Sequence, residues 1–368
     1  MRTDIWRHFD FILLGIMTIM IIFGVAMIRS AIAGNVELIE LNVVGRQIIY
    51  ASFGIFVIIA VTFLDYHLWP TIGRILYGVL FLLFGVIAAS GEAAFGSSRW
   101  LDFFGLFPIQ PSELAKITMI IMLADFFSRN QQRIKDLRWV ARSFLLAAGL
   151  LVPVLLQPDL STSIVLGVIW FALLWATGLE WKHLALFAVL GLLLPIIAFP
   201  FLENYQQQRI VTFAFPDPDA RYGEEYNINQ AQITIGSGGW FGLGYGQGSQ
   251  TQLRYLKVRH IDFIFASIGE EFGFAGNMFV MVLLFLLIWR ILRAAKLAQD
   301  TFGALLCFGV AALIGFQGMV NIGVNLNLLP VTGLTLPFVS YGGSSLLSLM
   351  LGIGLVQSVV ARHKVLEF

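Results

Sequence analysis

The chain has 368 residues, of which 58% are hydrophobic and 12% are charged, and its formal net charge is +1. Ordinary soluble domains carry about a quarter charged residues, so this composition excludes a soluble protein and indicates a polytopic membrane protein. The balanced charge gives no sign of a nucleic-acid partner. Cys307 is the single cysteine, which excludes an intrachain disulfide and a cysteine-based metal site.

Apolar runs long enough to cross a bilayer, about 17 to 25 residues each, can be placed at ten points of the chain. They lie near residues 9–31, 47–64, 73–90, 111–127, 143–157, 161–179, 184–201, 263–292, 302–327 and 335–360. We therefore predict an all-α polytopic integral membrane protein with ten transmembrane helices in one domain, residues 1–368. A long polar loop, residues 203–263, separates the seventh helix from the eighth. Its interspersed aromatic residues predict at least one short helix on the membrane surface.

The Lys and Arg residues of the connections predict the orientation. If both termini are cytoplasmic, the inner connections hold fourteen of these residues and the outer connections hold eight. The stretch from Arg129 to Arg142 is the strongest inner marker and is interpreted as a topogenic basic loop. The distribution therefore predicts cytoplasmic termini and an extracytoplasmic 203–263 segment.

Charged residues inside predicted spans are informative because each costs a few kcal/mol, about 2.5 to 3.5 on insertion scales, unless it is paired or faces water. Glu113 and Lys116 are three residues apart, so they share a helix face and can pair. Two interpretations remain open. The pair either holds neighbouring helices together or lines a polar cavity near the outer surface.

Three further polar places interrupt the apolar sequence. Asp159 follows Gln157-Pro158 and either caps the next helix or, with the hydroxyls after it, faces a cavity that binds anions or sugar hydroxyls. Glu270 and Glu271 suit the start of a helix through its dipole, and at most one of them can face the same cavity as Asp262. The turn-rich stretch from Asn321 to Ser345 must line something if it lies within the bilayer.

The polar loop contains a glycine-rich segment, residues 236–248, and ends at Asp262. Seven of the thirteen residues of this segment are glycine, so its backbone can bend sharply and approach a ligand closely. Asp262 stands where the apolar sequence resumes. A carboxylate beside a flexible polar wall at a membrane surface suggests a site for a lipid-borne substrate.

Several of these motifs, in this order along the whole chain, resemble the signatures of the SEDS family (shape, elongation, division and sporulation proteins). The matching segments are Gln110-Pro111-Ser112-Glu113-x-x-Lys116, Gln157-Pro158-Asp159, Gly236-Ser237-Gly238-Gly239-x-x-Gly242, Asp262 to Gly273, Asn321-Ile322-Gly323, and Leu329 to Ser345. The short N-terminus and the Gly248-to-Leu253 stretch resemble the elongation-type members more than the division-type members.

The resemblance implies a peptidoglycan glycosyltransferase in the bacterial cytoplasmic (inner) membrane. Such an enzyme polymerises lipid II at the outer leaflet, together with a class B penicillin-binding protein, a transpeptidase that crosslinks the product. Asp262 matches the family's essential aspartate. The chain departs from the usual pattern just before it, where Ile261 replaces a threonine and an upstream proline is missing.

The residue types agree with that chemistry. A β-1,4 link formed from an α-linked sugar diphosphate inverts the anomeric carbon, so one general base suffices, and Asp262 fits that role. The departing diphosphate needs positive charge from Lys116, Arg99, Arg209, Arg221 or a divalent cation, Mg²⁺ or Mn²⁺, for which Asp262 is a possible ligand. Glu113, Asp159 and Ser340 complete the predicted substrate-binding residues. No organic cofactor is expected.

A flippase or transporter of a lipid-linked precursor is the alternative, since buried charges also mark transport paths; a scaffolding membrane protein is a third reading. A transferase gathers its polar groups on the outer side, whereas a transporter needs a path to the inner side. For the transpeptidase partner, the small residues of the eighth and ninth predicted helices, Gly276 and Gly309 among them, suggest an exposed docking face.

Overall fold

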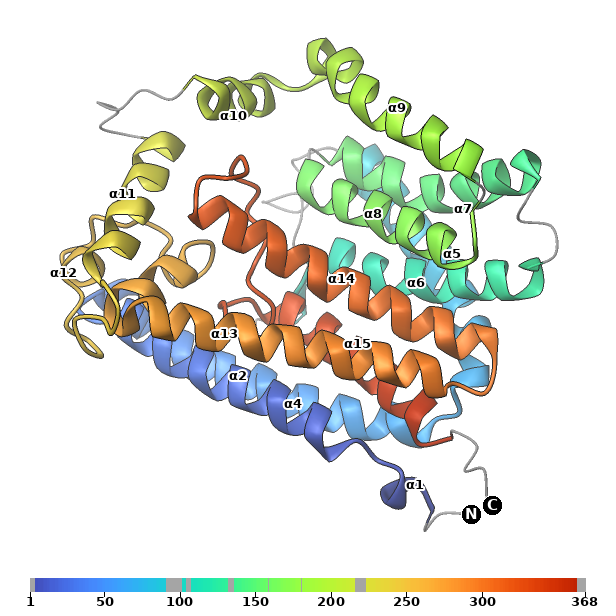
Figure 1. Cartoon of the computed structure of the whole chain (residues 1–368), viewed down its shortest axis with the longest axis horizontal. Coiled ribbons are helices and arrows are strands. Elements are labelled where there is room, and N and C mark those ends of the chain that lie inside the picture. Colours follow the sequence, from blue (N-terminus) through green and yellow to red (C-terminus); the bar gives the residue numbers. More distant parts are fainter. Residues whose placement is uncertain are drawn as a thin grey trace.

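The structure, a computed structural model, describes residues 4–90, 101–103, 107–131, 136–157, 159–179, 181–215 and 223–362. Helices dominate it (Figure 1). The long helices of the first half are α2 (Phe11–Ala31), α4 (Val43–Phe63), α5 (Trp69–Ser90), α6 (Pro111–Arg129), α7 (Leu137–Leu156), α8 (Leu160–Ala176) and α9 (Trp181–Ala198). Those of the second half are α13 (Ile264–Leu297), α14 (Thr301–Asn325) and α15 (Gly343–Val360).

Shorter elements connect the long helices. They are α1 (Asp4–Arg7), α3 (Val36–Glu40), α10 (Asn204–Ala214), α11 (Gly223–Ser237), α12 (Ser249–Gln252), and two 3₁₀ turns, η1 (Tyr66–Leu68) and η4 (Phe199–Phe201). The strands β1 (Leu101–Phe103) and β2 (Phe107–Ile109) form an antiparallel pair that precedes α6 in the sequence. This pair of strands is a small departure from the predicted all-α fold. The polar loop between α9 and α13 contains α10, α11 and α12.

Each of the ten predicted spans overlaps one long helix, although residues 335–342 of the tenth precede α15. Among the described residues, seven helices are long and apolar enough to cross a membrane: α2, α4, α5, α7, α13, α14 and α15. The helix α8 is apolar but shorter, and α6 carries Glu113, Lys116, Asp125 and Arg129. The chain is therefore a multi-pass, largely helical membrane protein.

Aspartate side chains begin several of these helices. The carboxylates of Asp10, Asp136, Asp159 and Asp300 accept hydrogen bonds from backbone N–H groups in the first turns of α2, α7, α8 and α14. Such caps satisfy N–H groups that have no partner within the helix. At α6 the corresponding signal is Pro111, which occupies the first turn.

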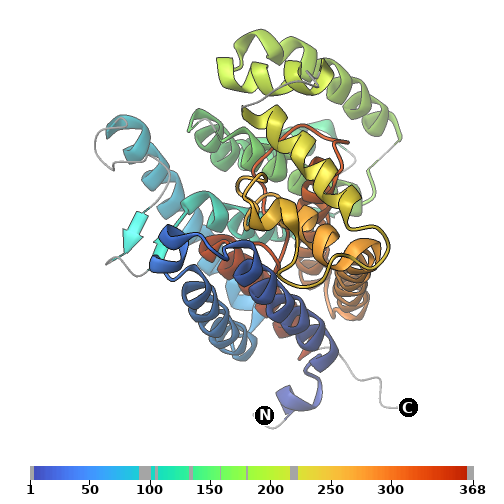
Figure 2. The same ribbon diagram turned by 90° about the vertical axis from the view of Figure 1, so that its left-hand side faces the viewer.

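The helices α14 and α15 form the centre of the bundle. They contact each other, α14 packs against α6, α8 and α13, and α15 packs against α4 and α6. Figure 2 shows the red helix α15 surrounded by the others. Glycines allow these close approaches, because a side chain at Gly309 would meet Ile120 of α6 and Leu173 of α8.

Three glycines of the predicted docking face, Gly276, Gly303 and Gly309, are buried and cannot form it. Gly309 is buried against α6 and α8, and Gly303 faces Tyr66 and Val359. Gly276 is also buried, beneath the side chain of Phe272. These three glycines serve packing within the chain, a use that their pattern alone does not distinguish from binding another helix.

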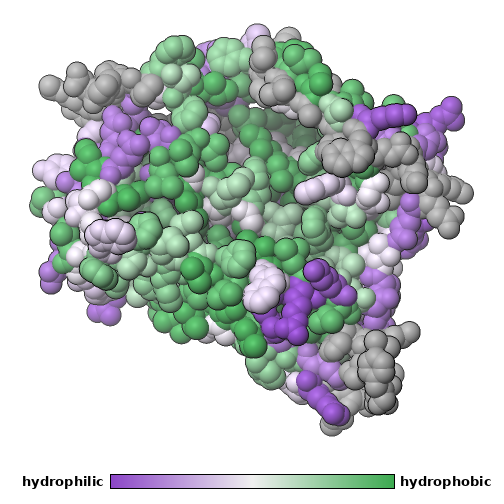
Figure 3. Space-filling model, in the orientation of Figure 1, coloured by the Kyte–Doolittle hydropathy of each residue, from purple (hydrophilic) through white to green (hydrophobic). Residues whose placement is uncertain are grey.

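The two ends of the bundle differ. Both termini lie at one end, and α11, α12 and the glycine-rich segment lie at the other (Figure 1). In Figure 3 the hydrophilic residues gather mainly towards the margins and the surface between them is predominantly hydrophobic. This banding is what a bilayer requires of a bundle that crosses it.

The glycine-rich segment packs against a break in α13. Gly273 has φ 66° and interrupts the helix. The carbonyls of Glu270 and Glu271 accept hydrogen bonds from Leu243 and Gly244 at 2.9 and 3.0 Å, and the N–H groups of Phe274 and Ala275 donate to Gly239 and Trp240 at 2.8 and 3.1 Å. The close approach expected of this segment is thus to another part of the chain, whose freed backbone groups it satisfies.

Candidate functional site

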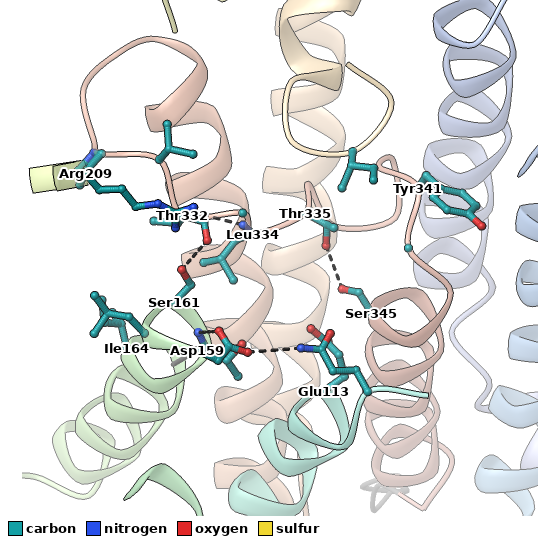
Figure 4. A pocket seen from close by; sticks show the side chains of 18 of the residues that line it. Glu113, Asp159, Ser161, Ile164, Arg209, Thr332, Leu334, Thr335, Tyr341 and Ser345 are labelled. Atoms are coloured by element: carbon teal, nitrogen blue, oxygen red, sulfur yellow. Dashed lines mark hydrogen bonds between the residues drawn. The ribbon is translucent and has the colours of Figure 1, made fainter. Parts of the chain in front are cut away.

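A cavity of about 570 Å³ lies where α6, α8 and α10 meet the segment between α14 and α15 (Figure 4). Its polar lining includes Gln110, Glu113, Asp159, Ser161, Thr162, Gln206, Arg209, Thr332, Thr335, Tyr341 and Ser345. Three of the predicted substrate-binding residues, Glu113, Asp159 and Arg209, are therefore brought together. They come from α6, from the N-cap of α8 and from α10, which is why their proximity is not visible in the sequence.

Glu113 and Lys116 form the predicted ion pair. Lys116 Nζ lies 2.7 Å from Glu113 Oε2, which also accepts a hydrogen bond from Ser348 Oγ at 3.2 Å. Glu113 lines the cavity, whereas Lys116 is fully buried beneath it and is not part of the lining. Both interpretations of the motif are thus realised, since the pair joins α6 to α15 and also presents a carboxylate to the cavity.

Asp159 both caps α8 and lines the cavity. Its Oδ1 caps α8 by accepting from Thr162 N at 3.1 Å, and its Oδ2 accepts from Gln110 Nε2 at 3.3 Å. Gln110 immediately precedes α6, so this contact ties the start of α8 to the start of α6. The carboxylate lies beside Glu113 in the cavity wall (Figure 4).

Two arginines stand near the cavity. Arg209 reaches it from α10. Arg46 of α4, which the sequence did not single out, lies close to the side chain of Tyr341, itself a lining residue. Arg99 and Arg221, also expected near the diphosphate, lie outside the described residues.

The segment between α14 and α15 forms one wall. Ser161 Oγ donates to the carbonyl of Thr332, and the hydroxyls of Thr335 and Ser345 lie 2.9 Å apart (Figure 4). Ser340 is not among the lining residues: its Oγ donates to the carbonyl of Ile261 at 2.6 Å and accepts from Leu336 N at 2.9 Å. It therefore attaches the loop that carries Asp262 to this wall.

Asp262 is half-buried at the end of that loop, two residues before α13 begins. Its neighbour Ile261 lines the cavity, whereas Asp262 is not among the lining residues. The backbone carbonyl of Asp262 accepts hydrogen bonds from Asn321 Nδ2 at 3.0 Å and from Asn325 Nδ2 at 2.9 Å. The predicted base thus lies at the edge of the cavity, and two asparagines of α14 hold its backbone carbonyl.

These two asparagines position the Asp262 loop, although in the sequence they appear only as part of a polar stretch. Asn325 Oδ1 also accepts from Ala266 N at 3.1 Å, and Asn321 Nδ2 also donates to the carbonyl of Leu334 at 2.8 Å. They connect α14 to the Asp262 loop, to α13 and to the cavity wall. Their spacing of four residues on one face of an apolar helix was the available signal.

Glu270 and Glu271 hold the polar loop rather than the cavity. Glu270 is fully buried and accepts from Gln250 N at 2.7 Å and from Thr251 N and Oγ1 at 2.9 and 2.6 Å. Glu271 accepts from the hydroxyl of Ser30 on α2. The two carboxylates point to different partners, as adjacent helical residues must, and neither serves mainly the helix dipole.

His260 is the basic side chain nearest to Asp262 in the sequence. Burial and then the nearby charge of Arg259 lower its pKa from 6.5 to about 4. Its ring lies 6.0 Å from that of Tyr341, measured between centroids. At neutral pH the imidazole is therefore uncharged and adds no positive charge beside Asp262.

Among the described residues no group of three His, Cys, Asp or Glu side chains could hold a metal ion. Carboxylate oxygens such as those of Asp262, Glu113 and Asp159 suit Mg²⁺ or Mn²⁺, but Mg²⁺ sites of this kind use one or two carboxylates and complete the shell with water and phosphate oxygens. The residues present therefore fit a cation that arrives with a diphosphate.

Comparison with known proteins agrees with this architecture. The chain is 35% identical over 363 residues to the peptidoglycan glycosyltransferase MrdB of Escherichia coli, covering 98% of this chain and 95% of that protein. It is 35% identical over 365 residues to the probable peptidoglycan glycosyltransferase FtsW of Geobacter metallireducens, covering 97% and 96%. Stage V sporulation protein E of Bacillus subtilis is 35% identical over 320 residues, covering 85% and 86%.

Solved structures resemble the whole bundle. A chain from a study of the structural coordination of polymerization and crosslinking by a peptidoglycan synthase complex has a TM-score of 0.79 at 29% identity, covering 96% of this chain and 98% of that chain. The rod shape determining protein RodA of Thermus thermophilus has a TM-score of 0.68 at 29% identity, covering 96% and 97%. The model of the FtsW/RodA/SpoVE family of cell cycle proteins matches residues 10–365. The chain therefore belongs to this family, the SEDS family whose motifs its sequence carries.

Proposed function

We propose that the protein is a peptidoglycan glycosyltransferase that polymerises lipid II into β-1,4 glycan strands, with Asp262 as the general base. The observation that carries the proposal is the cavity beside the Asp262 loop, which gathers carboxylates, hydroxyls and an arginine from elements far apart in the chain. Relatives of matching length are named peptidoglycan glycosyltransferases. Our preference for the elongation role rests on MrdB and RodA among these relatives.

In this mechanism the Asp262 carboxylate takes the proton of the acceptor hydroxyl as that oxygen attacks the anomeric carbon of the donor. The bond to the diphosphate breaks, and the anomeric configuration inverts, so no carboxylate nucleophile is needed. The asparagines of α14 fix the backbone of Asp262 by holding its carbonyl. Such fixed geometry supplies part of the rate enhancement, because the base does not have to be positioned in each cycle.

The departing diphosphate requires cations. Arg209 is the candidate that lines the cavity. Lys116 acts through Glu113, whose carboxylate it neutralises at 2.7 Å, and this lowers the repulsion that an anionic substrate would meet. A divalent cation held by Asp262 and the diphosphate would supply further positive charge, and Arg99 and Ser340 stay candidates for the substrate site.

We further propose that all ten long helices cross the membrane and that both termini are cytoplasmic. The terminal end of the bundle holds Arg7, Arg290, Arg293 and Arg362, in agreement with the positive-inside rule. The cavity and the polar loop then belong to the outer side, where lipid II presents its sugars.

A class B penicillin-binding protein is the proposed partner. The supporting observation is the likeness to a chain from a peptidoglycan synthase complex that coordinates polymerization and crosslinking. A transpeptidase beside the polymerase would receive the glycan as it forms.

The transporter alternative is less well supported, because the α6 side chains beneath Glu113 are closely packed. Below Glu113 the side chains of Lys116, Ile117 and Ile120 on α6 are buried, with exposed fractions of 0, 1 and 0%. A path to the inner side would have to pass through this packing.

Purified full-length protein supplied with labelled lipid II tests the proposal. Asp262→Asn should reduce polymerisation by about 10² to 10⁴, the range of general acid–base catalysis, with an unchanged melting temperature. Asp65→Asn makes the same chemical change at the opposite end of the bundle and should polymerise normally. Wild-type rates from Asp262→Asn would overturn the general-base assignment, and inactive wild-type protein that moves lipid II across vesicles would favour transport.

A further inference from the structure

A second cavity, of about 420 Å³, lies at the end of the bundle that holds both termini. The residues before α2, the last two turns of α13 and the last residue of α15 surround it. Its lining consists of Arg7, His8, Phe9, Asp10, Phe11, Ile12, Arg290, Arg293, Ala294, Leu297 and Val360. Three arginines therefore converge from two separate segments on one hollow, and the glycosyl transfer proposed above uses none of them.

The acid in this lining, Asp10, pairs with only one of the three arginines. Asp10 Oδ2 accepts from Arg290 Nε at 3.1 Å and Nη2 at 2.7 Å, and Asp10 Oδ1 caps α2 through Leu13 N at 2.9 Å. Both carboxylate oxygens are thus occupied. In the part of the chain that the structure describes, no acidic side chain pairs with Arg7 or Arg293, and both are exposed. The described lining side chains therefore carry a net positive charge.

Apolar side chains adjoin this charge. Phe11, Ile12 and Leu297 line the same cavity and have exposed fractions of 59, 58 and 44%. Trp289, 57% exposed, lies one helical turn before Arg293 on α13, and exposed tryptophans of this kind sit at the membrane interface. An occupant with an anionic head and apolar chains would satisfy both parts of the lining.

We propose that this cavity binds the headgroup phosphate of an anionic phospholipid of the inner leaflet. Arg7 and Arg293 contact the phosphate, and the acyl chains run along Phe11, Ile12 and Leu297. Basic pockets between helix ends at the cytoplasmic surface are a recurrent form of lipid recognition. The positive-inside rule accounts for the number of arginines at this end, but it does not account for their convergence on a cavity of ligand size. The assignment to the inner leaflet depends on the orientation proposed above, whereas the proposed binding does not.

Native mass spectrometry of the full-length protein in neutral detergent tests the site, with phosphatidylglycerol as the probe and phosphatidylcholine, a zwitterion of zero net charge, as the comparison. The key variant is Arg7→Gln with Arg293→Gln. Arg290 is kept, because its loss would leave the Asp10 carboxylate without a positively charged partner. The matched control is Arg138→Gln with Lys296→Gln, which removes two exposed positive charges from α7 and α13 without touching the lining.

Wild type and control should retain one phosphatidylglycerol, and the key variant should bind it about 30-fold more weakly, the equivalent of about 1 kcal/mol for each charge. Hydrogen exchange of residues 5–12 should slow when the lipid is added to wild type. An equal loss of affinity in the control would overturn the proposal in favour of general attraction to basic ends. The proposal would also be overturned if phosphatidylcholine were retained equally, or if millimolar inorganic phosphate slowed the hydrogen exchange in place of lipid. Slower exchange with an acidic peptide alone would overturn it in favour of a protein partner. The measurement uses no lipid II, so failure of the proposed glycosyl transfer leaves it intact.

Discussion

At the scale of single residues, the pair of Glu113 and Lys116 illustrates how a membrane protein keeps charge inside. Lys116 is fully buried and its nitrogen lies 2.7 Å from Glu113 Oε2. Desolvating two ions is expensive, and their attraction repays this cost only while both are present. Breaking the pair is therefore more damaging than replacing it.

We expect Lys116→Met to lower stability by about 3 to 5 kcal/mol, because it leaves a buried carboxylate unpaired. The double variant Glu113→Gln, Lys116→Met should recover most of that loss while remaining impaired in polymerisation. Lys257→Met, at an exposed position of the polar loop, is the control. Melting temperatures and lipid II polymerisation of the three proteins separate the two roles, and normal activity of the double variant would make the pair purely structural.

His260 predicts a dependence of stability on pH. Its pKa is about 4 in the folded protein and 6.5 without perturbation, with burial as the main cause. In the unfolded chain the imidazole gains its proton at higher pH, so the stabilisation is complete above 6.5 and is lost as the pH falls towards 4. Unfolding midpoints between pH 7.5 and 4.5 should decline less in His260→Gln than in wild type. Equal declines would refute the assignment.

At the scale of elements, the break in α13 and the glycine-rich segment form one unit. Gly273 frees backbone groups that residues 239–244 satisfy. Gly242 has φ 81°, and a Cβ there would lie 2.2 Å from the carbonyl oxygen of Glu271. The glycines are thus required by contact between two backbones.

Gly242→Ala should cost more than about 1 kcal/mol from the positive φ alone, with a further loss from the clash, and should loosen the loop that leads to Asp262. Gly236→Ala is the control, since a Cβ there meets nothing within 4 Å and the residue lies in α11. Thermal melting together with polymerisation rate checks both. A variant at Gly242 as stable as the one at Gly236 would contradict the described packing.

At the scale of the whole molecule, the sequence predicts the helices well, because each long apolar run must form its own hydrogen bonds in a bilayer. The pairing of Glu113 with Lys116 and the capping by Asp159 were also predictable, since both are local. The meeting of Asp159 with Gln110, and of Asp262 with Asn325, depends on how distant helices pack. For the same reason the docking face expected from the small residues of α14 was wrong for Gly303 and Gly309. Their pattern permits close packing but does not identify the neighbouring helix.

The proposed orientation predicts a labelling pattern. Cys307 is the single cysteine and is buried, so one cysteine introduced into a Cys307→Ala background reports its own location. Ser249→Cys should react with a membrane-impermeant maleimide in intact spheroplasts, whereas Arg138→Cys should react only after lysis. The reverse pattern would invert the topology.

The packed α6 side chains beneath Glu113 have a consequence for a protein in a membrane that carries a voltage. If water fills the cavity down to Glu113, most of the transmembrane voltage falls across the apolar layer beneath it, where a lone charge would feel about 2.3 kcal/mol per 100 mV over the full drop. Glu113 and Lys116 enter that field as a neutral pair. Changes in membrane potential should therefore leave the shape of the cavity unchanged. In a variant that keeps only one of the two charges, the folding of the protein would depend on the membrane potential.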